Sequence, residues 1–338
     1  MSYDQSSKRR KTGEASFVDP SRLSSRFQAS CYEGGRDWTI SVAVPVSILS
    51  DAITNDRRTA VAGRIARALA VFAVDEIVLY DDTPEDARPK RVDPKSYTGD
   101  VDPGHFLEHL LGYLEVPPFM RKLLYPLHPN LRLAGQLPAL EMPHHPNPQD
   151  FLPYREGVAG KGTPKGTMID IGFKTPVLIE DEVPPNTRVT LHYPDPDSEK
   201  AEACDPAAPR EEGGYYWGYT VRRASSLSAM FTECKYEGGY DVSIGTSERG
   251  RGLAQEFPNP GPLDFKHLLI VFGGPRGIEY AAVNDKELAE GMELSSGRTK
   301  ELFDHWVNVL PGQSSRSIRT DEALFIALTG LRRLWYEE

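Results

Sequence analysis

Residues 308–323 read NVLPGQSSRSIRTDEA and carry the most informative local pattern in the chain. A short strand is predicted from Trp306 to Leu310, and it leads into a polar, serine-rich loop. A helix is predicted from Thr320 to Leu334, because Asp321 and Glu322 in its first turn suit the positive end of a helix dipole. The exposed backbone between strand and helix suits an adenine edge and a carboxylate, and a merely solvated loop is the alternative.

The same arrangement of strand and glycine-rich loop occurs twice before this stretch. The predicted strand Tyr240 to Ile244 ends in the loop GTSERGRG (245–252), and His267 to Phe272 ends in GGPRG (273–277). Ligands bind beyond the carboxyl ends of parallel strands, and glycine lets a backbone approach a ligand closely. GGPRG matches neither a Rossmann GxGxxG nor a Walker pattern, and an ordinary turn between strand and helix is its alternative.

The N-terminal half predicts more of the same α/β pattern. A strand is expected from Trp38 to Val46, a helix within Asp51 to Ala73 and a buried strand from Asp75 to Tyr80. Asp102 is expected to cap a further helix that has Pro103 at its first position. Strands that alternate with helices in this way predict a parallel sheet with helices packed on it.

A different pattern interrupts this α/β arrangement. Between Arg155 and Tyr193 the chain has short alternating segments broken by glycine and proline, which is typical of a small barrel or sandwich. The aromatic segment Tyr215 to Val221 (YYWGYTV) is expected to close the barrel. We therefore expect an inserted β-domain at 151–217 within an α/β domain formed by 36–150 and 218–338.

Composition and charge narrow the class of protein. The chain has 338 residues, of which 39% are hydrophobic and 26% charged, and it has no apolar run of membrane-spanning length. It has no N-terminal signal-peptide pattern, so we expect an intracellular protein. The formal net charge of −10 counts against unspecific coating of nucleic acid, but it leaves room for a local basic face.

The tail and the cysteines add two expectations. Residues 1–35 are polar and are expected to be disordered, with a basic cluster at Lys8 to Lys11. That cluster is either a nuclear-import signal or RNA-contacting arm, or a solvated tail. The three cysteines, Cys31, Cys204 and Cys234, form no CxxC pair, so we expect reduced thiols and no zinc site.

Six stretches together resemble the SPOUT (trefoil-knot) RNA methyltransferases, in the eukaryotic and archaeal branch with an inserted OB-like β-barrel. They are LAGQLPALEMPHH (133–145), REGV (155–158), YYWGYTVRRASSLS (215–228), YDVSIGTSERG (240–250), LIVFGGPRGIE (269–279) and NVLPGQSSRSIRTDEA (308–323). The resemblance implies a knotted α/β fold, S-adenosylmethionine as methyl donor with S-adenosylhomocysteine as product, and a homodimer. It also implies methylation of a base, a uridine ring nitrogen, in ribosomal or other structured RNA. A nuclear or nucleolar location follows from that substrate, with the cytoplasm as a second one.

The same resemblance points to residues of the donor site. These are Thr246, Gly273, Gly274, Gly277, Asn308, Leu310, Gly312, Gln313, Ile318 and Thr320. A bulky residue at Gly274 is expected to fill space that the ligand needs. For dimerisation, the apolar residues Leu324, Phe325 and Leu328 of the last helix are expected to serve core and interface together.

Charged residues near these loops are candidates for RNA contacts and catalysis. Arg249, Arg316 and Arg319 are expected to hold a phosphate or the target base, because a guanidinium makes planar, forked contacts, with surface salt bridges as the alternative. Glu248 is a candidate proton acceptor, with a helix-capping or ion-pair role as the favoured alternative.

Two further pairs of residues lie outside these loops. Arg222 and Arg223 follow the aromatic segment and are expected to bind RNA, although its Trp217 is as well explained by packing in a core. His144 and His145 are adjacent in sequence and lack a third ligand nearby, so no metal site is expected.

Two other functions remain open at this point. One is a non-catalytic RNA-binding or scaffold protein that keeps the knotted fold, with a role at the mitotic spindle or centrosome as in some members of this branch. The other is a nucleotide-binding α/β enzyme of another kind, which the lack of Rossmann and P-loop patterns disfavours.

Overall fold

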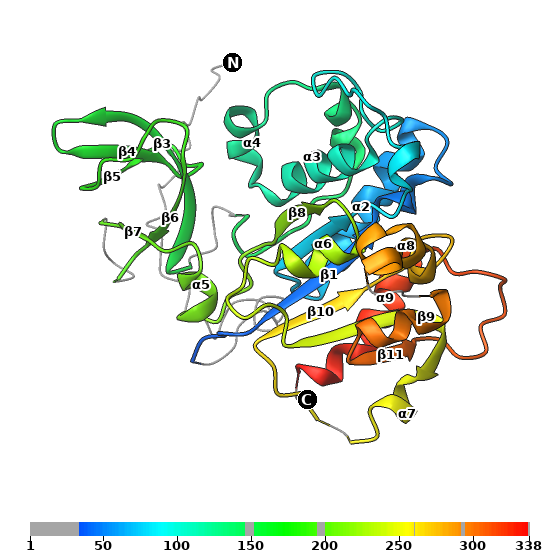
Figure 1. The fold of residues 1–338 in the computed structure, drawn as a ribbon. Helices are drawn as coiled ribbons and strands as arrows, with labels where there is room; N and C mark the ends of the chain where they lie inside the picture. The colour runs from blue at the N-terminus through cyan, green and yellow to red at the C-terminus, as the bar shows by residue number, and fades with distance from the viewer. Residues whose placement is uncertain (1–33, 146–151, 195–199, 260, 292–294, 337–338) are drawn as a thin grey trace, which may run out of the picture. The chain divides into compact units, whose positions relative to one another are not determined.

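The computed structural model describes residues 34–145, 152–194, 200–259, 261–291 and 295–336 (Figure 1). The basic cluster Lys8 to Lys11, Cys31 and nearly all of the predicted tail lie outside these residues. The chain divides into two compact units, one within Pro146–Pro206 and one formed by Ser30–His145 with Ala207–Glu338. Among the described residues, no helix combines the length and the apolar character that crossing a membrane requires.

The larger unit is built on a six-stranded sheet in the order β11-β9-β10-β1-β2-β8, in which every pair of neighbours is parallel. The strands are β1 (Thr39–Pro45), β2 (Glu76–Tyr80), β8 (Thr220–Ala224), β9 (Val242–Gly252), β10 (His267–Val271) and β11 (His305–Asn308). The predicted parallel sheet is thus confirmed.

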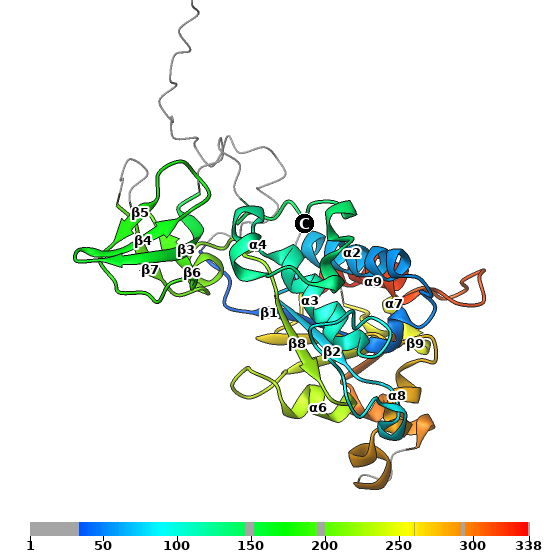
Figure 2. The same cartoon turned by 90° about the horizontal axis from the view of Figure 1, so that it is seen from above.

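Helices cover both faces of this sheet (Figures 1 and 2). The helices of the unit are α2 (Asn55–Val71), α3 (Pro103–Glu115), α4 (Pro118–Leu124), α5 (Ala208–Glu211), α6 (Leu227–Thr232), α7 (Leu253–Glu256), α8 (Ile278–Asn284) and α9 (Thr320–Leu331). Short 3-10 turns are η2 (Val46–Leu49), η3 (Glu85–Ala87), η4 (Pro129–Leu131), η5 (Ala134–Gln136), η7 (Ser296–Leu302) and η8 (Arg332–Leu334), and η6 (Glu287–Gly291) is a π-helical turn.

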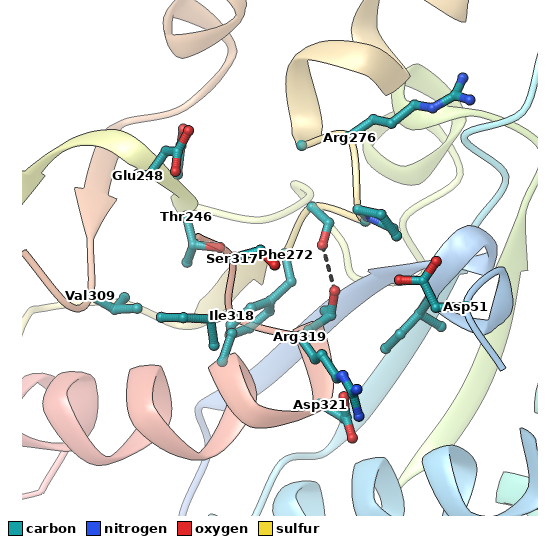
Figure 3. A pocket seen from close by; sticks show the side chains of 18 of the residues that line it. Asp51, Thr246, Glu248, Phe272, Arg276, Val309, Ser317, Ile318, Arg319 and Asp321 are labelled. Carbon is teal, nitrogen blue, oxygen red and sulfur yellow. Dashed lines mark hydrogen bonds between the residues drawn. The ribbon is translucent and has the colours of Figure 1, made fainter. Parts of the chain in front are cut away.

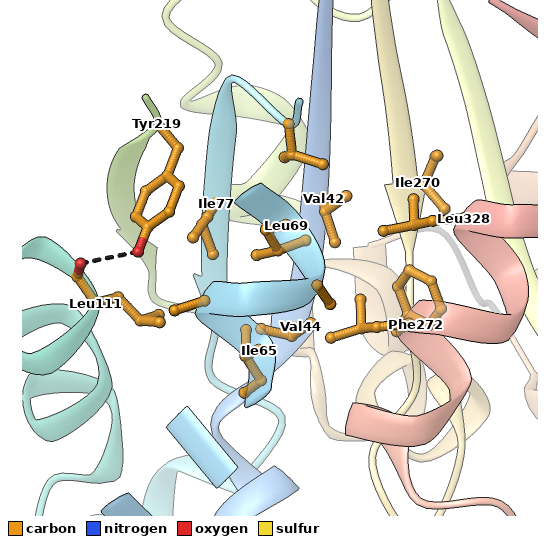
Figure 4. Packing of buried hydrophobic residues seen from close by; sticks show 14 of the residues in the cluster. Val42, Val44, Ile65, Leu69, Ile77, Leu111, Tyr219, Ile270, Phe272 and Leu328 are labelled. Carbon is orange, nitrogen blue, oxygen red and sulfur yellow. Dashed lines mark hydrogen bonds between the residues drawn. The ribbon is translucent and has the colours of Figure 1, made fainter. Parts of the chain in front are cut away.

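Alternation along the strands decides which side chains meet which helices. Val42 and Val44 of β1 lie in one apolar cluster with α2, α3 and α9, whereas Ala43 lies in another with α6 and α8. Figure 4 shows the first cluster, where Leu69 of α2 and Leu328 of α9 pack over the sheet. Burying one such leucine contributes about 1.5–3 kcal/mol, so these two layers hold the strand ends in fixed register.

The predicted start of α3 is confirmed in detail. The Asp102 carboxylate accepts a hydrogen bond from the His105 backbone N–H at 2.9 Å, and Pro103 occupies the first helical position. The first N–H groups of a helix lack partners within it, and Asp102 satisfies one of them.

The smaller unit is a five-stranded antiparallel sheet in the order β5-β4-β3-β6-β7. Its strands are β3 (Tyr154–Thr163), β4 (Gly166–Asp170), β5 (Val177–Ile179), β6 (Arg188–His192) and β7 (Glu202–Cys204). Ile169 and Leu191 are fully buried in a core of this unit's own residues. The short alternating segments therefore predicted antiparallel strands correctly.

The expectation that Tyr215 to Val221 closes the barrel is wrong. Thr220–Ala224 forms β8, which pairs with β2 at the edge of the parallel sheet. Tyr216 and Tyr219 are buried in the core of the larger unit, and their hydroxyls donate to the carbonyls of Val74 and Leu111, each at 3.0 Å. A buried tyrosine needs an acceptor for its hydroxyl, and helices and loops of the larger unit supply it.

Candidate functional site

A pocket of about 920 Å³ lies at the carboxyl ends of β10 and β11 and beside residues 246–249 of β9 (Figure 3). All three predicted loops contribute to its lining, together with residues of α2 and the turn before it. Nearly all predicted donor-site residues line it: Thr246, Gly273, Gly274, Gly277, Asn308, Leu310, Gln313, Ile318 and Thr320. The pocket also contains Arg249, Arg316, Arg319 and Glu248. The structure thus brings these residues together, while their roles stay predictions.

The segment 245–252 differs from the expected loop because it continues β9 as far as Gly252. It pairs with β11 through a register shift between Trp306 and Val307. A Cβ at Gly250 would lie 2.3 Å from the Val307 carbonyl carbon, so glycine permits this close approach. Asn308 fixes the junction by donating its side-chain amide to the Glu248 carbonyl at 2.9 Å.

Close backbone packing requires glycine at two positions of the GGPRG turn. A Cβ at Gly273 would lie 2.7 Å from the Ile278 nitrogen and 2.8 Å from Gly277 backbone atoms. Gly277 itself has φ +80°, a conformation that favours glycine. Both glycines therefore hold the tight turn into α8.

A glycine at position 274 is also required by packing within the protein, while its role in leaving space for a ligand stays a prediction. A Cβ there would meet the Ser47 hydroxyl oxygen at 2.2 Å and Asp82 Oδ2 at 3.2 Å. It would thus press on the buried Ser47–Asp82 hydrogen bond of 2.5 Å, which lies beside the turn, and not only on space for a ligand. Burial raises the pKa of the Asp82 carboxyl.

The loop before α9 closes the pocket and is tied to the GGPRG turn. The Thr320 hydroxyl donates to the Gly273 carbonyl at 2.9 Å, which joins the start of α9 to the end of β10. Figure 3 shows the apolar side chains of Val309 and Ile318 next to each other, near Phe272 and Thr246. Gly312 has φ +76° and lies outside the lining, so its place is in the turn.

Thr246 and Gln313 are occupied within the protein. The Thr246 hydroxyl donates to the Val271 carbonyl at 2.9 Å and so links β9 to β10. The Gln313 side-chain amide donates to the Ser315 carbonyl at 3.2 Å, within its own loop. A ligand could therefore contact mainly the backbone of these two residues and the side-chain polar atoms that these hydrogen bonds leave free.

Positive charge exceeds negative charge around the pocket, although the chain carries −10 overall. Six arginines line it, Arg57, Arg64, Arg249, Arg276, Arg316 and Arg319, against the four carboxylates of Asp51, Glu248, Glu279 and Asp321. A charged cleft concentrates ligands of opposite sign even on a protein of the same sign. The pocket therefore combines an apolar wall, suited to a flat ring, with a surplus of arginine, suited to a polyanion.

A family comparison identifies the class of this site. Residues 39–331 match the model of a family described as "Putative RNA methyltransferase". The chain belongs to this family. The match extends from β1 to α9 and so includes the whole pocket.

Relatives from two animals are similar along most of the chain. A Drosophila melanogaster protein named 28S rRNA (uridine-N(3))-methyltransferase is 43% identical over 309 residues, which are 87% of this chain and 62% of that protein. A human protein of the same name is 41% identical over 310 residues, which are 88% of this chain and 79% of that protein. The chain thus spans somewhat less than two thirds of the Drosophila relative.

Sequence reasoning missed the contribution of α2 and α8 to the site. Arg64 of α2 forms an ion pair with the buried Asp321 at the start of α9. Glu279 of α8 accepts a hydrogen bond from the Ser247 hydroxyl at 3.2 Å and lies 3.7 Å from the Arg249 guanidinium. These pairs join segments that are distant in sequence, so no local motif predicts them. The one signal for Glu279 is its place two residues after GGPRG.

Arg222 and Arg223 lie outside the pocket lining and have partners inside the protein. The Arg222 guanidinium donates to the Met230 carbonyl at 2.9 Å and lies 3.5 Å from the buried Glu76 carboxylate. Arg223 forms an ion pair with Asp102 at 2.7 Å. These contacts favour a structural role for Arg222 in particular, and RNA binding by the pair stays a prediction.

His144 and His145 both face Glu115. His144 Nε2 lies 2.9 Å from the Glu115 carboxylate, and His145 Nε2 lies 2.6 Å from the Glu115 carbonyl oxygen. Burial lowers the pKa of His145 to about 3, so its ring is neutral at pH 7. Within the described ranges, no group of three or more His, Cys, Asp or Glu residues is arranged to hold a metal ion.

Proposed function

We propose that this protein transfers a methyl group from S-adenosylmethionine to N3 of a uridine in 28S ribosomal RNA. The observation that carries the proposal is the pocket beside three parallel strands, in a chain 41–43% identical to two proteins named for that reaction. Family membership supports RNA methylation, and the names of the relatives support the base and the atom.

The residues of the pocket fit the proposed methyl donor. Apolar side chains of Val309, Ile318 and Phe272 suit the adenine ring, and the glycines of the GGPRG turn leave backbone close to the ligand. When bound, S-adenosylmethionine supplies an activated methyl group on a sulfonium sulfur. The work left to the protein is to align the RNA base with that methyl group and to exclude water.

Arginine side chains are suited to the charge that develops on the base. N3 of uridine carries a proton that must pass to a base, for which Glu248 is the candidate. The negative charge left by the proton is shared by N3 and the two carbonyl oxygens of the ring until the methyl group is transferred from the sulfonium, which neutralises the base and leaves S-adenosylhomocysteine. A guanidinium that donates to one of these oxygens stabilises that charge. Arg249 is the best supported candidate, because Glu279 lies 3.7 Å from its guanidinium and the Arg249 backbone N–H donates to the Ser247 hydroxyl at 3.2 Å.

We also propose that the larger unit is a trefoil knot and that the smaller sheet is an OB-like barrel. The strand order supports the knot, because β10 lies between β9 and β1, whereas the following strand β11 lies on the far side of β9. The chain must therefore pass across β9 before α9 returns to Gly273 through Thr320. The antiparallel order of β3 to β7, with its own core, supports the barrel.

The proposed homodimer interface has fewer exposed apolar residues on α9 than the sequence analysis expected. Leu324 and Leu328 are fully buried in the core, so only Phe325 of the three expected residues is available to a partner. Phe325 is 37% exposed and Val71 of the neighbouring α2 is 52% exposed, and together they support an interface on this face. Light scattering should give a dimer for the wild type and a monomer for Phe325→Glu, and a monomeric wild type would contradict the proposal.

Methyl transfer to defined RNA tests the function itself. The purified protein is incubated with labelled S-adenosylmethionine and 28S rRNA fragments, and the RNA is digested to nucleosides for mass spectrometry. We expect 3-methyluridine at one position and no other methylated nucleoside. RNA binding without any transfer would instead support the scaffold role. A nuclear location is proposed from the rRNA substrate, and a fluorescent fusion with and without residues 8–11 tests it.

A further inference from the structure

The arginines around the pocket differ in whether the protein itself satisfies them. Arg64 pairs with Asp321, Arg249 lies 3.7 Å from Glu279, and the Arg276 guanidinium lies 4.7 Å from the centre of the Tyr280 ring. Of the remaining three, Arg57 and Arg316 have no ion pair and no side-chain hydrogen bond within the described part of the chain, whereas Arg319 takes part with Glu322 in capping the start of α9. All three are exposed, and we call them the rim arginines.

Arg57 stands out against the other arginines of its own helix. Arg58 donates to the Asp100 carboxylate at 2.5 Å and to the Tyr97 hydroxyl at 3.3 Å, and Arg67 donates to the Leu140 carbonyl at 2.6 Å. The nearest carboxylate in sequence is the fully exposed Asp56, whose lowered pKa is due first to a hydrogen bond from the Thr54 side chain and only to a smaller extent to the charge of Arg57. Arg57 thus keeps its donors available beside the pocket.

The rim arginines come from two separate parts of the pocket wall. Arg57 belongs to α2, whereas Arg316 and Arg319 belong to the loop that leads into α9. Figure 3 shows that Arg319 and Arg276 project from opposite sides of the pocket, so cationic side chains are not confined to one wall. An extended anion that crosses the opening can therefore meet guanidinium groups from α2 and from the loop.

The chemistry of the proposed substrate requires such an anion there. N3 lies on the base-pairing edge of uridine, so a paired uridine hides the atom that is to be methylated. The target must be unpaired or turned out of its helix, and the phosphates on both sides of it then need separate support. The guanidinium fork matches phosphate oxygens, and unpaired arginine carries no cost of breaking an internal ion pair.

We propose that Arg57 and Arg316 bind the phosphates that flank an unpaired target uridine, one from α2 and the other from the loop before α9. This inference rests on the proposed function, since it assigns the RNA backbone to that same pocket. It adds Arg57, which no sequence motif marks, and it restricts the substrate to uridine held in a single-stranded or extruded state.

Binding of RNA can be measured separately from methyl transfer. Fluorescence anisotropy follows a labelled single-stranded RNA with one central uridine, added to the full-length protein with S-adenosylhomocysteine over a range of salt concentrations. Each lost phosphate contact should lower the slope of log K against log salt by about 0.7 for single-stranded RNA. We expect Arg57→Ala and Arg316→Ala each to weaken binding about three- to tenfold and to lower this slope accordingly.

Matched variants separate the proposed role from general effects of charge. Arg91 is exposed and lies outside the pocket lining, so Arg91→Ala removes the same charge and should leave affinity and slope unchanged. Arg57→Lys should restore the slope but only part of the affinity, because lysine keeps the charge without the fork. The same uridine placed inside a stable duplex should bind much more weakly.

Three outcomes would overturn this inference. An unchanged salt slope for Arg57→Ala would remove Arg57 from the RNA contacts. A parallel loss of S-adenosylhomocysteine affinity, measured by calorimetry, would instead assign Arg57 to the carboxylate of the donor. Equal binding of the paired uridine would exclude the requirement for an unpaired base. If the slopes change as expected but no methyl transfer occurs, the phosphate contacts stand and the proposed function fails.

Discussion

Replacing Gly273 by alanine tests whether the GGPRG turn shapes the ligand pocket. The new Cβ would lie 2.7 Å from the Ile278 nitrogen and 2.8 Å from two backbone atoms of Gly277, whereas ordinary contacts begin near 3.4 Å. These neighbours are backbone atoms, so no side-chain rotation relieves the clash. The turn must move by several tenths of an ångström, and overpacking of this kind costs about 1–3 kcal/mol.

The expected movement affects binding because Gly273, Gly274 and Gly277 all line the pocket. The Gly273 carbonyl also accepts the Thr320 hydroxyl, so a shifted turn disturbs the start of α9. If about 1.4 kcal/mol of the cost falls on the bound state, the Kd rises tenfold. We therefore expect Gly273→Ala to weaken S-adenosylhomocysteine binding about tenfold or more in calorimetry.

Gly135→Ala is the matched control for this substitution. Gly135 lies outside the pocket lining, and a Cβ there would have no atom within 4 Å among the described residues. Its Kd should equal that of the wild type, and chemical unfolding should show a stability at least as high. Wild-type affinity in a folded Gly273→Ala variant would refute the assignment of the donor to this turn.

Three further substitutions test charges that the structure places at buried positions. Burial raises the pKa of Asp82, so the unfolding free energy should fall as the pH rises from about 3.8 through the raised pKa. Denaturant titrations at several pH values should show a smaller fall for Asp82→Asn. Burial, with His128 and His105 nearby, lowers the pKa of His109 to about 4 from 6.5, so stability should be lost as the pH falls through that interval. The His109→Gln variant should lose less unfolding free energy than the wild type over this pH interval. An equal loss would mean that another titrating group causes the pH dependence. Arg64→Ala leaves the Asp321 carboxylate buried without its ion pair; because Arg64 is half exposed, we expect a cost of about 1–2 kcal/mol, and an unchanged melting temperature would contradict it.

Much of the larger unit could be predicted because its signals are local. The short apolar runs in HLLIVF and DEIVLY predict buried strands, and Asp102 before Pro103 predicts the start of α3 through the hydrogen bond that forms there. The three loops were expected to meet, since parallel strands place their carboxyl ends at one edge of the sheet. For the same reason most of the expected donor-site residues do line one pocket.

The features that the sequence did not predict depend on contacts between residues that are far apart in the chain. The segment YYWGYTV has the alternation of a strand in either unit, and only the acceptors Val74 and Leu111 for its tyrosines place it in the larger one. The segment 245–252 is polar and glycine-rich, yet β11 lies close enough to extend β9 through it. Arg57 reaches the pocket only because its helix packs beside α9.

Mapping of modified uridines in cellular RNA shows whether this protein methylates 28S rRNA in the cell. Total RNA from cells with and without this protein is compared by sequencing that detects 3-methyluridine, and Gly273→Ala and Arg57→Ala serve as variants in the depleted cells. The account predicts that one unpaired uridine of 28S rRNA loses its N3 methyl group without the protein. The wild type should restore the mark fully, and each variant should restore only part of it. An unchanged modification map in cells without the protein would contradict the account.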